Sequence, residues 1–452
     1  MVERGAPPGP RSWLPLGQGR AFRRNPLEYL AWQHQQFGDF SRFRLLSLDA
    51  YLLAHPDYIR DLLLQHSGAT VKSLALQRAK SLLGEGLLTS EPPLHTRQRR
   101  LMQPAFHQER LIRYGAIMTS TGEEWLRRWE AMRLADGTID LHGEMMQLTL
   151  SIVVRALFSS DLVPVAQELS QLTTLVVRMF PYLISPFGEY VEYLPLPVSQ
   201  QFRKARERLD SLIYGLIADR RSGKTEGDDL LSMLLAAQDR EAAASDSRMT
   251  DRQIRDELIT LFLAGHETTA NALTWTWYLL SQNPEAESRF HQEIDRVPPG
   301  RLPVLEDIPN LTYTNAVLSE SMRLYPPAWG VSRLTKQEIQ IAGYAIPRGS
   351  LCIASQWVTH RDSRFFPQPE SFLPERWIDQ TVLRPRFSYF PFGAGSRICI
   401  AERFAWMEAT LLLALLGQRW CFRLAAEAKV QPDPLITLRP KFGLMVNAKP
   451  RI

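Results

Sequence analysis

The arrangement of apolar and polar residues is helical over most of this chain. Apolar positions that recur every three to four residues predict helices over 26–37, 57–66, 110–133 and 141–160, and a longer helix over 250–283. Alternation typical of strands is confined to short stretches, at 40–53, at 338–355, and in a hairpin formed by 435–438 and 442–446. The pattern therefore predicts a mainly α fold with small β-sheets.

Two stretches lack a lasting period. Residues 67–93 contain many leucines but no repeat, which favours a mobile loop. Residues 179–197 mix prolines, which interrupt helices, with aromatic side chains that offer adaptable apolar surface. The second stretch is compatible with a packed loop and with a lid over a binding site, and the pattern does not separate the two.

Composition narrows the class of protein. The chain has 452 residues, of which 45% are hydrophobic and 22% charged, as is usual for globular proteins. Its length alone favours two or three domains. The net charge of +5, without a long basic run, does not indicate nucleic-acid binding. A locally basic face for an acidic electron donor is compatible with it.

The N-terminal segment, the apolar runs and the number of cysteines indicate where in the cell the protein is found. No run of eighteen apolar residues occurs, so we expect no transmembrane anchor. A Pro/Gly-rich lead over residues 1–20 lacks the apolar centre of a signal peptide. Three scattered cysteines are too few for a disulfide framework. These features predict a soluble, cytoplasmic protein.

A glycine-containing loop holds the main candidate chemistry. It reads Phe392-Gly393-Ala394-Gly395-Ser396-Arg397-Ile398-Cys399-Ile400-Ala401, and an apolar helical pattern follows. Glycine takes positive φ without steric cost, so the loop can turn tightly. A sulfur at a helix start is favoured as thiolate, and Arg397 can pair with an anion. The run predicts a socket for a metal cofactor with carboxylates, although Cys399 alone would more often be a small buried apolar residue.

A second motif lies in the middle of the long helix, whose start at Thr250 and Gln253 has the form of a capping box. The motif reads Ala264-Gly265-His266-Glu267-Thr268-Thr269. A mid-helix glycine costs about 1 kcal/mol, so its space is needed, and Thr268 can bond back to a carbonyl one turn earlier. A zinc-protease helix is excluded because its second histidine would be at Ala270.

Two pairs of residues share helix faces. His95 and Arg99 are four residues apart, and on their own they are better explained as part of a solvated charged stripe. Glu320 and Arg323 are three apart, a spacing that alone indicates only a weak surface ion pair. Their meaning depends on the rest of the chain.

Together these motifs resemble the cytochrome P-450 family of haem-thiolate monooxygenases. The cysteine loop is similar to the haem-binding pattern Phe-Gly-x-Gly-x-Arg-x-Cys-x-Gly, except that Ala401 replaces the last glycine and adds a methyl group near the porphyrin. Residues 264–269 are similar to the family's oxygen-binding motif, and Pro326-Pro327 and the 372–377 run are further landmarks. The resemblance covers nearly the whole chain and implies the cytochrome P-450 fold, with one large triangular domain over 1–452.

The resemblance also implies roles for individual residues. Cys399 would be the metal ligand of haem b (iron protoporphyrin IX), and Thr268 and Glu267 would be catalytic, in hydrogen bonding and proton relay. Residues 67–93 would lie over the distal face and 179–197 would form the substrate-entrance lid. The remaining expected sites are the cofactor-binding residues His95, Arg99, Arg333, Arg397, Phe392, Gly393, Ala264 and Gly265; a pocket of Leu83, Ala264, Trp329 and Val331; and a structural network of Glu320, Arg323 and Arg376.

The implied function is insertion of one oxygen atom of O2 into an apolar substrate. No reductase is fused in this sequence, so a ferredoxin and a ferredoxin reductase are the expected electron donors, and a monomer is expected. The run 323–329 is similar to that of carotenoid-hydroxylating members, which favours an isoprenoid, with fatty acids and terpenes as alternatives. A peroxygenase or rearranging haem-thiolate enzyme, and a non-enzymatic haem protein, remain alternative readings.

Overall fold

The computed structural model describes residues 6–10, 17–45, 47–132, 137–159, 168, 172, 194, 196–239, 247–298, 301–379, 381 and 383–451. Its α-helices are α1 (Gly19–Arg24), α2 (Pro26–Phe37), α3 (Pro56–Arg60), α4 (Leu74–Arg78), α5 (Lys80–Leu83), α6 (Leu94–Met102), α7 (Gln108–Ala131), α8 (Leu141–Phe158), α11 (Pro197–Arg221), α12 (Leu230–Ala236), α13 (Asp251–Gln282), α14 (Pro284–Ile294), α15 (Thr312–Leu324), α16 (Gln356–Thr359) and α17 (Glu402–Arg419). Short 3-10 or π turns include η1 (Asp61–Gln65), η2 (Ser67–Ala69), η3 (Gln103–Phe106), η6 (Leu305–Asn310), η7 (Pro374–Trp377) and η8 (Gly395–Arg397).

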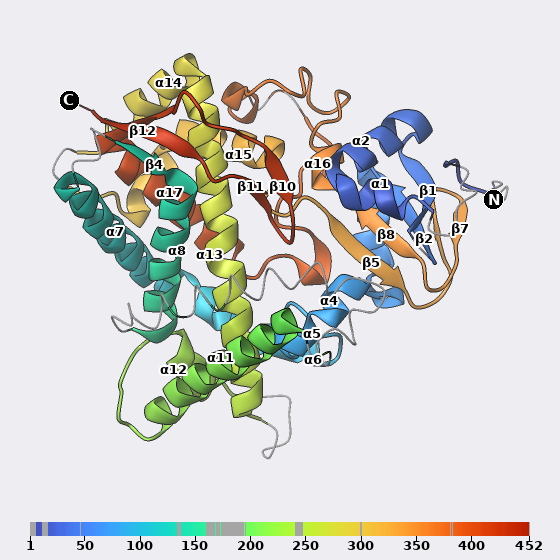
Figure 1. The fold of residues 1–452 in the computed structure, drawn as a ribbon, viewed down its shortest axis with the longest axis horizontal. Helices are drawn as coiled ribbons and strands as arrows, with labels where there is room; N and C mark the ends of the chain where they lie inside the picture. Colours follow the sequence, from blue (N-terminus) through green and yellow to red (C-terminus); the bar gives the residue numbers. More distant parts are fainter. Residues whose placement is uncertain are drawn as a thin grey trace.

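The strands form small sheets beside the helices. They are β1 (Phe40–Leu45), β2 (Leu48–Leu53), β3 (Thr70–Lys72), β4 (Thr138–Asp140), β5 (Val331–Thr335), β6 (Ile339–Ile341), β7 (Tyr344–Ile346), β8 (Leu351–Ala354), β9 (Trp420–Leu424), β10 (Pro432–Pro434), β11 (Leu438–Pro440) and β12 (Met445–Pro450). The largest described sheet has the order β1-β2-β8-β5-β3, with α1 and α2 beside it on the right of Figure 1. The fold is mainly α with small sheets, as predicted.

Helix α13 runs through the middle of the helical part, with α8 along one side (Figure 1). Its start carries the predicted capping box, in which the Thr250 side chain accepts the Gln253 N–H and the Gln253 side chain accepts the Thr250 N–H. Helices α15 and α17 also pack against it. One buried cluster joins α7, α8, α13, α15 and α17, and a second joins α6, α8, α11 and α12 to the first half of α13. A helix buried on most sides is a rigid support for a site at its centre.

Predictions of helices and strands were confirmed where the pattern of apolar residues is periodic. Helix α2 spans the predicted 26–37, and β1 pairs with β2 so that Asp49, opposite Arg44, lies next to the turn. The predicted helix over 57–66 divides into α3 and the π turn η1. Helix α17 ends at Arg419, and no helix among the described residues is long and apolar enough to cross a membrane.

Two local predictions were wrong. Residues 67–93, expected as a loop, contain β3, α4 and α5, because β3 is held by pairing with the distant strand β5. The expected hairpin of 435–438 and 442–446 is displaced: β10 pairs with β11, whereas β12 pairs with β4 and β9. Nearly all of 179–197 lies outside the described residues.

Candidate functional site

The cysteine loop is a tight turn that ends at the start of α17. Gly393 and Gly395 have φ values of 73° and 74°, the left-handed region that favours glycine. A side chain at Gly395 would meet the Leu63 carbonyl oxygen at 2.5 Å, so η1 packs directly on the loop. The Cys399 N–H donates to the Phe392 carbonyl at 3.0 Å. The loop is thereby fixed at both of its ends.

Cys399 is exposed, although protein surrounds its sulfur closely on several sides. Burial raises the pKa of the Cys399 thiol to about 11, against the lowering effects of the Ala401 N–H and Arg99. The Ala401 N–H at the helix start acts in the predicted direction on the Cys399 pKa, but desolvation of the sulfur is the larger effect in the metal-free protein. A bound metal cation deprotonates a coordinating thiol outright, so the thiolate form requires the metal.

The centre of α13 presents one open face. Ala264 is exposed although its helix runs through the interior, and Thr268, one turn later, is partly exposed. The Thr268 hydroxyl donates to the Ala264 carbonyl at 2.7 Å, as its position predicted. Leu261 and Leu263 pack against the same apolar cluster as Ile400, which follows Cys399. The open stretch of α13 and the cysteine loop thus meet at one cluster.

Gly265 and Glu267 point away from this open face. A side chain at Gly265 would meet Val153 of α8 at 3.2 Å, so the glycine allows α8 and α13 to approach closely. Glu267 is buried, and its carboxyl accepts a hydrogen bond from the Thr437 hydroxyl at 2.5 Å. To pass a proton toward Thr268, the Glu267 carboxyl would have to leave Thr437.

Helix α6 brings His95 and Arg99 to the cysteine loop. The Arg99 guanidinium donates to the Ile398 carbonyl at 2.6 Å, so it lies beside Cys399. His95 is buried at 4% exposure, and burial, with Lys72, Arg397 and Arg99 nearby, lowers its pKa to about 4. At neutral pH the imidazole is uncharged and can donate one hydrogen bond.

Arg333 and Arg397 extend this group of buried cations. Arg397 pairs with Glu91, yet its Nη1 is buried without a hydrogen-bond partner among the described residues. Arg333 donates to the carbonyl of its neighbour Ser332 at 3.0 Å. Burial and the nearby Arg397 lower the pKa of Arg333 to about 10. Buried guanidinium groups with so little compensation are a site for anionic ligands.

The residues present fit a haem. Cys399 offers one soft thiolate, the ligand type that holds iron in haem-thiolate proteins. Arg397 Nη1 is an orphaned buried donor, and Arg333 and His95 lie near it, which suits the two carboxylates of protoporphyrin. Gly393 shapes the cysteine turn, and the Phe392 ring packs at the edge of the neighbouring apolar cluster.

The predicted pocket residues differ in position. Val331 is partly exposed at the start of β5, and the Trp329 indole N–H donates to the Leu435 carbonyl at 3.1 Å. Leu83, in contrast, is buried with Leu258 and Ile259 in the interior cluster. Leu88 is exposed at 37% and presents apolar surface that the sequence argument did not select.

Glu320, Arg323 and Arg376 form a buried network. Arg323 donates to both Glu320 carboxylate oxygens at 2.8 Å, and Arg376 donates to one of them at 2.9 Å. The Trp377 indole and the Leu373 N–H donate to the same carboxylate. This network fixes α15 against η7.

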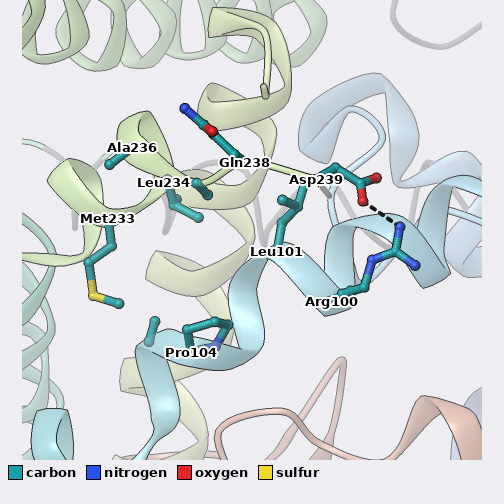
Figure 2. Close-up of a pocket in the computed structure, with 10 residues that line it drawn as sticks. Arg100, Leu101, Pro104, Met233, Leu234, Ala236, Gln238 and Asp239 are labelled. Carbon is teal, nitrogen blue, oxygen red and sulfur yellow. Dashed lines mark hydrogen bonds and ion pairs between the residues drawn. The ribbon is translucent and has the colours of Figure 1, made fainter. Parts of the chain in front are cut away.

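A separate pocket of about 540 Å³ lies between α6, η3 and α12 (Figure 2). Leu101, Pro104, Met233 and Leu234 line its apolar wall, and the Arg100–Asp239 ion pair spans one side at 2.7 Å. Neither Cys399 nor Thr268 lines it. This pocket therefore does not account for the chemistry of the cysteine loop.

Sequence reasoning missed two charged residues at the site, Lys72 and Glu91. Both lie in the stretch 67–93, where no periodic pattern indicated ordered structure. The Glu91 carboxylate accepts the Lys72 backbone N–H at 2.7 Å and binds Arg397. The only signal in the sequence was that Lys72 and Glu91 are charged residues in a leucine-rich stretch. This signal was too weak to place either side chain at the site.

Comparison with known proteins finds one matching family over nearly the whole chain. The family model for cytochrome P450 matches residues 7–450. Cyclooctatin synthase of Streptomyces melanosporofaciens is 41% identical over 94% of this chain and 92% of that protein. Cyclooctat-9-en-7-ol 5-monooxygenase of the same organism is 34% identical over 90% and 87%. Pentalenene oxygenase of Streptomyces avermitilis is 34% identical over 94% and 92%.

Proposed function

Because this chain belongs to the cytochrome P450 family and is a monooxygenase of that family, we propose that it inserts one oxygen atom of O2 into a terpene. The family implies a haem-thiolate cofactor, and we assign it as haem b held by Cys399. The whole chain would form one haem domain. The observation that carries the proposal is an exposed Cys399 beside buried cations, next to the open face of α13.

The cysteine side of the site would hold and orient the cofactor. Cys399 supplies the thiolate, and the Arg99 cation beside it stabilises that negative charge. Arg333, Arg397 and His95 would bind the carboxylates, with Gly393 and Phe392 shaping the loop. Haem bound in this way supplies the oxygen-activating chemistry, because a thiolate ligand favours O–O cleavage.

On the side of the site formed by α13, the helix would leave room for O2 and supply protons. The small side chain of Ala264 leaves this face of α13 uncrowded. Gly265 lets α13 approach α8, so the groove for O2 would be formed by the helix backbone rather than by a side chain at Gly265. The Thr268 hydroxyl can turn its proton from the Ala264 carbonyl toward the open face. Glu267 would relay protons only after release from Thr437, so its role includes a conformational step.

A terpene is the substrate class favoured among the three that the sequence left open. Support comes from three of the similar proteins, cyclooctatin synthase, cyclooctat-9-en-7-ol 5-monooxygenase and pentalenene oxygenase, whose names indicate cyclic terpenes. The side chains expected to line the space, Ala264, Trp329 and Val331, are apolar, and none carries a charge for a fatty-acid carboxylate. Leu88 adds exposed apolar surface. An uncharged, compact hydrocarbon substrate suits such a wall.

Electrons would come from separate proteins. The family generally uses redox partners and hydrophobic substrates. We propose a ferredoxin and a ferredoxin reductase, since a net charge of +5 favours encounter with an acidic donor. We expect the chain to act as a monomer.

The reduced protein with carbon monoxide gives the first test. Thiolate-ligated haem should show a strongly red-shifted Soret band, which Cys399→Ser should abolish because the soft ligand is lost. Cyclic terpene hydrocarbons should then shift the ferric spectrum, and fatty acids of similar size should not. Turnover with a surrogate ferredoxin and reductase should yield a mono-oxygenated product. A folded protein that takes up no haem, or activity that survives Cys399→Ser, would contradict the proposal.

A further inference from the structure

A row of polar side chains leads from Glu267 to the start of α8. The Thr437 hydroxyl, which donates to the Glu267 carboxyl at 2.5 Å, lies 3.1 Å from the side-chain nitrogen of Asn271. The side-chain oxygen of Asn271 lies 3.0 Å from Nε2 of His142. Asn271 is fully buried, whereas His142 is partly exposed in the first turn of α8. Three hydrogen bonds thus connect Glu267 to a side chain that reaches solvent.

The donors in this row all point toward Glu267. Because the Thr437 hydroxyl has one proton and gives it to Glu267, its oxygen must accept the bond from Asn271. The amide nitrogen of Asn271 therefore faces Thr437, and its oxygen can only accept from His142. A neutral His142 must then carry its proton on Nε2. Hydrogen bonds aligned in one direction polarise one another, so each link strengthens the donation to Glu267.

The segment around Thr437 is fixed on two sides. The Trp275 indole of α13 donates to the Leu438 carbonyl at 2.9 Å, and the Leu438 N–H donates to the Pro327 carbonyl at 2.9 Å. Thr437 is therefore held in place and does not follow a moving carboxyl. The Glu267 carboxyl must break its bond to Thr437 before it can reach the open face of α13.

We propose that Asn271 and His142 are positioning residues for the reaction: through Thr437 they set how readily the Glu267 carboxyl turns toward Thr268. The inference rests on the proposed function, in which Glu267 relays protons. A longer row of aligned donors holds the carboxylate more firmly, so the carboxyl is free in fewer molecules when a proton is needed. The row thereby controls how much of the oxygen consumed appears as product and how much as peroxide.

The surroundings of His142 suit a neutral donor at the outer end of the row. Burial lowers the pKa of His142, and Arg439 acts in the same direction. Asp140, the bond to Asn271 and the Glu267 carboxylate act to raise this pKa, but burial outweighs them. At neutral pH the imidazole therefore donates one hydrogen bond without carrying a charge. Its titration senses Glu267 from the far end of the row and so gives a test that does not depend on turnover.

The main test asks whether His142 and Glu267 are connected through Asn271. His142 is titrated by NMR in the haem-loaded, carbon monoxide-bound protein with labelled histidine, and His142→Phe identifies its signal. Glu267→Gln removes the anion at the end of the row, so the midpoint of this titration should move to lower pH. In an Asn271→Leu background the same change should move the midpoint less than half as far. No shift in the otherwise wild-type protein, or a shift half as large or more in the Asn271→Leu background, would overturn the inference.

The partition of oxygen gives the second arm. Asn271→Leu frees the Glu267 carboxyl, so the peroxide released per O2 consumed should fall about twofold with a cyclic terpene hydrocarbon that shifts the ferric spectrum. In a Glu267→Gln background Asn271→Leu should leave this ratio unchanged, because no carboxyl remains to be freed. Unchanged or increased peroxide release in Asn271→Leu alone would overturn the inference, as would an equal fall in both backgrounds.

Control variants protect the interpretation. Thr276→Val is the matched control, since Thr276 is a fully buried hydroxyl of α13 that donates to the Ala272 carbonyl, and it should change neither readout. If Asn271→Leu does not fold, Thr437→Val takes its place, because it breaks the next link. It too should weaken the response of His142 to Glu267→Gln, and a response of full size would overturn the inference. A protein without the red-shifted carbon monoxide band would refute the proposed function, whereas a protein with this band but without the connection refutes this inference alone.

Discussion

Two groups of buried charged side chains in this molecule differ in how many of their hydrogen-bond donors have an acceptor. In the Glu320–Arg323–Arg376 network, every Arg323 donor group has an acceptor: Glu320 and the carbonyls of His360, Pro369 and Ser371. At the cysteine loop, among the residues that the structure describes, Arg397 Nη1 has no hydrogen-bond partner and the Lys72 ammonium reaches only a carbonyl.

The difference indicates what each group is for. A buried ion network with complete hydrogen bonds holds segments together and leaves no donor for a ligand. Buried cations without enough anions are costly, so they persist where a ligand completes them. We therefore assign the first group to the scaffold and propose the second for the cofactor site, although both contain buried arginines.

The largest effect should follow from breaking the complete network. Arg323→Met leaves the Glu320 carboxylate without its main partner at 0% exposure, which should cost about 3–5 kcal/mol in the free energy of unfolding. Urea unfolding measures this loss, and it should be the same with and without haem. Arg301→Met, which breaks an exposed pair with Asp307, is the control and should leave the free energy of unfolding nearly unchanged. A loss confined to the haem-loaded protein would place this network in the cofactor site.

At the cysteine loop, two substitutions should change haem binding in opposite directions. Arg397→Leu should weaken haem binding about ten- to a hundredfold, because a charge-assisted hydrogen bond is lost. Glu91→Gln should leave binding unchanged or tighten it, because it removes a negative charge that competes for Arg397. Haem transfer to apomyoglobin measures both. Weaker binding in both variants would show that the Glu91–Arg397 pair serves the scaffold instead.

A hydroxyl on the open face should affect chemistry rather than stability. Thr268→Ala should raise peroxide release several-fold per O2 consumed, since the proton at Oγ1 is lost, while unfolding changes by less than about 1 kcal/mol. Thr274→Ala is matched to it, because Thr274 makes the same bond to the carbonyl one turn earlier but is fully buried. Oxygen consumption and product are measured together. Unchanged coupling in Thr268→Ala would remove Thr268 from the reaction.

The smallest effect should come from a charge group near the surface. Burial acts to raise the pKa of Asp39, but hydrogen bonds from His34 and Arg364 outweigh it and hold that pKa well below its usual value. A lowered carboxyl pKa contributes stability above the unfolded value of about 4, and this is lost as the pH falls below it. Asp39→Asn should therefore cost about 1 kcal/mol at pH 7, and progressively less below pH 4. A difference that is constant across this range would contradict the assignment.

Much of the site was readable from local sequence. The glycine spacing before Cys399 fixed a turn that requires positive φ at Gly393 and Gly395. The Ala264–Thr269 run identified the middle of α13, and the bond from Thr268 to Ala264 depends only on helical spacing. In each case the chemistry and the structure lie within ten consecutive residues, so a local pattern was sufficient.

Other parts required the tertiary structure. The side chain of Glu267 was assigned to proton relay from the motif, but the distant Thr437 decides where its carboxyl points. The opposing effect of desolvation on the pKa of Cys399 was not visible in the sequence, because it depends on how closely the folded chain surrounds the sulfur. Leu83 was expected in the pocket from the family resemblance, yet its packing against α13 buries it.

By itself, the sequence determined the family, the helical framework, and the residues of the cysteine loop and of the oxygen-binding motif. The tertiary structure alone decided that Lys72 faces Arg333, because β3 has only three residues and its register is set by a strand some 260 residues later. Helical periodicity and turn chemistry act over a few neighbouring residues and leave a local pattern. Strand pairing and charge compensation join distant segments, so they become visible only when the chain is folded.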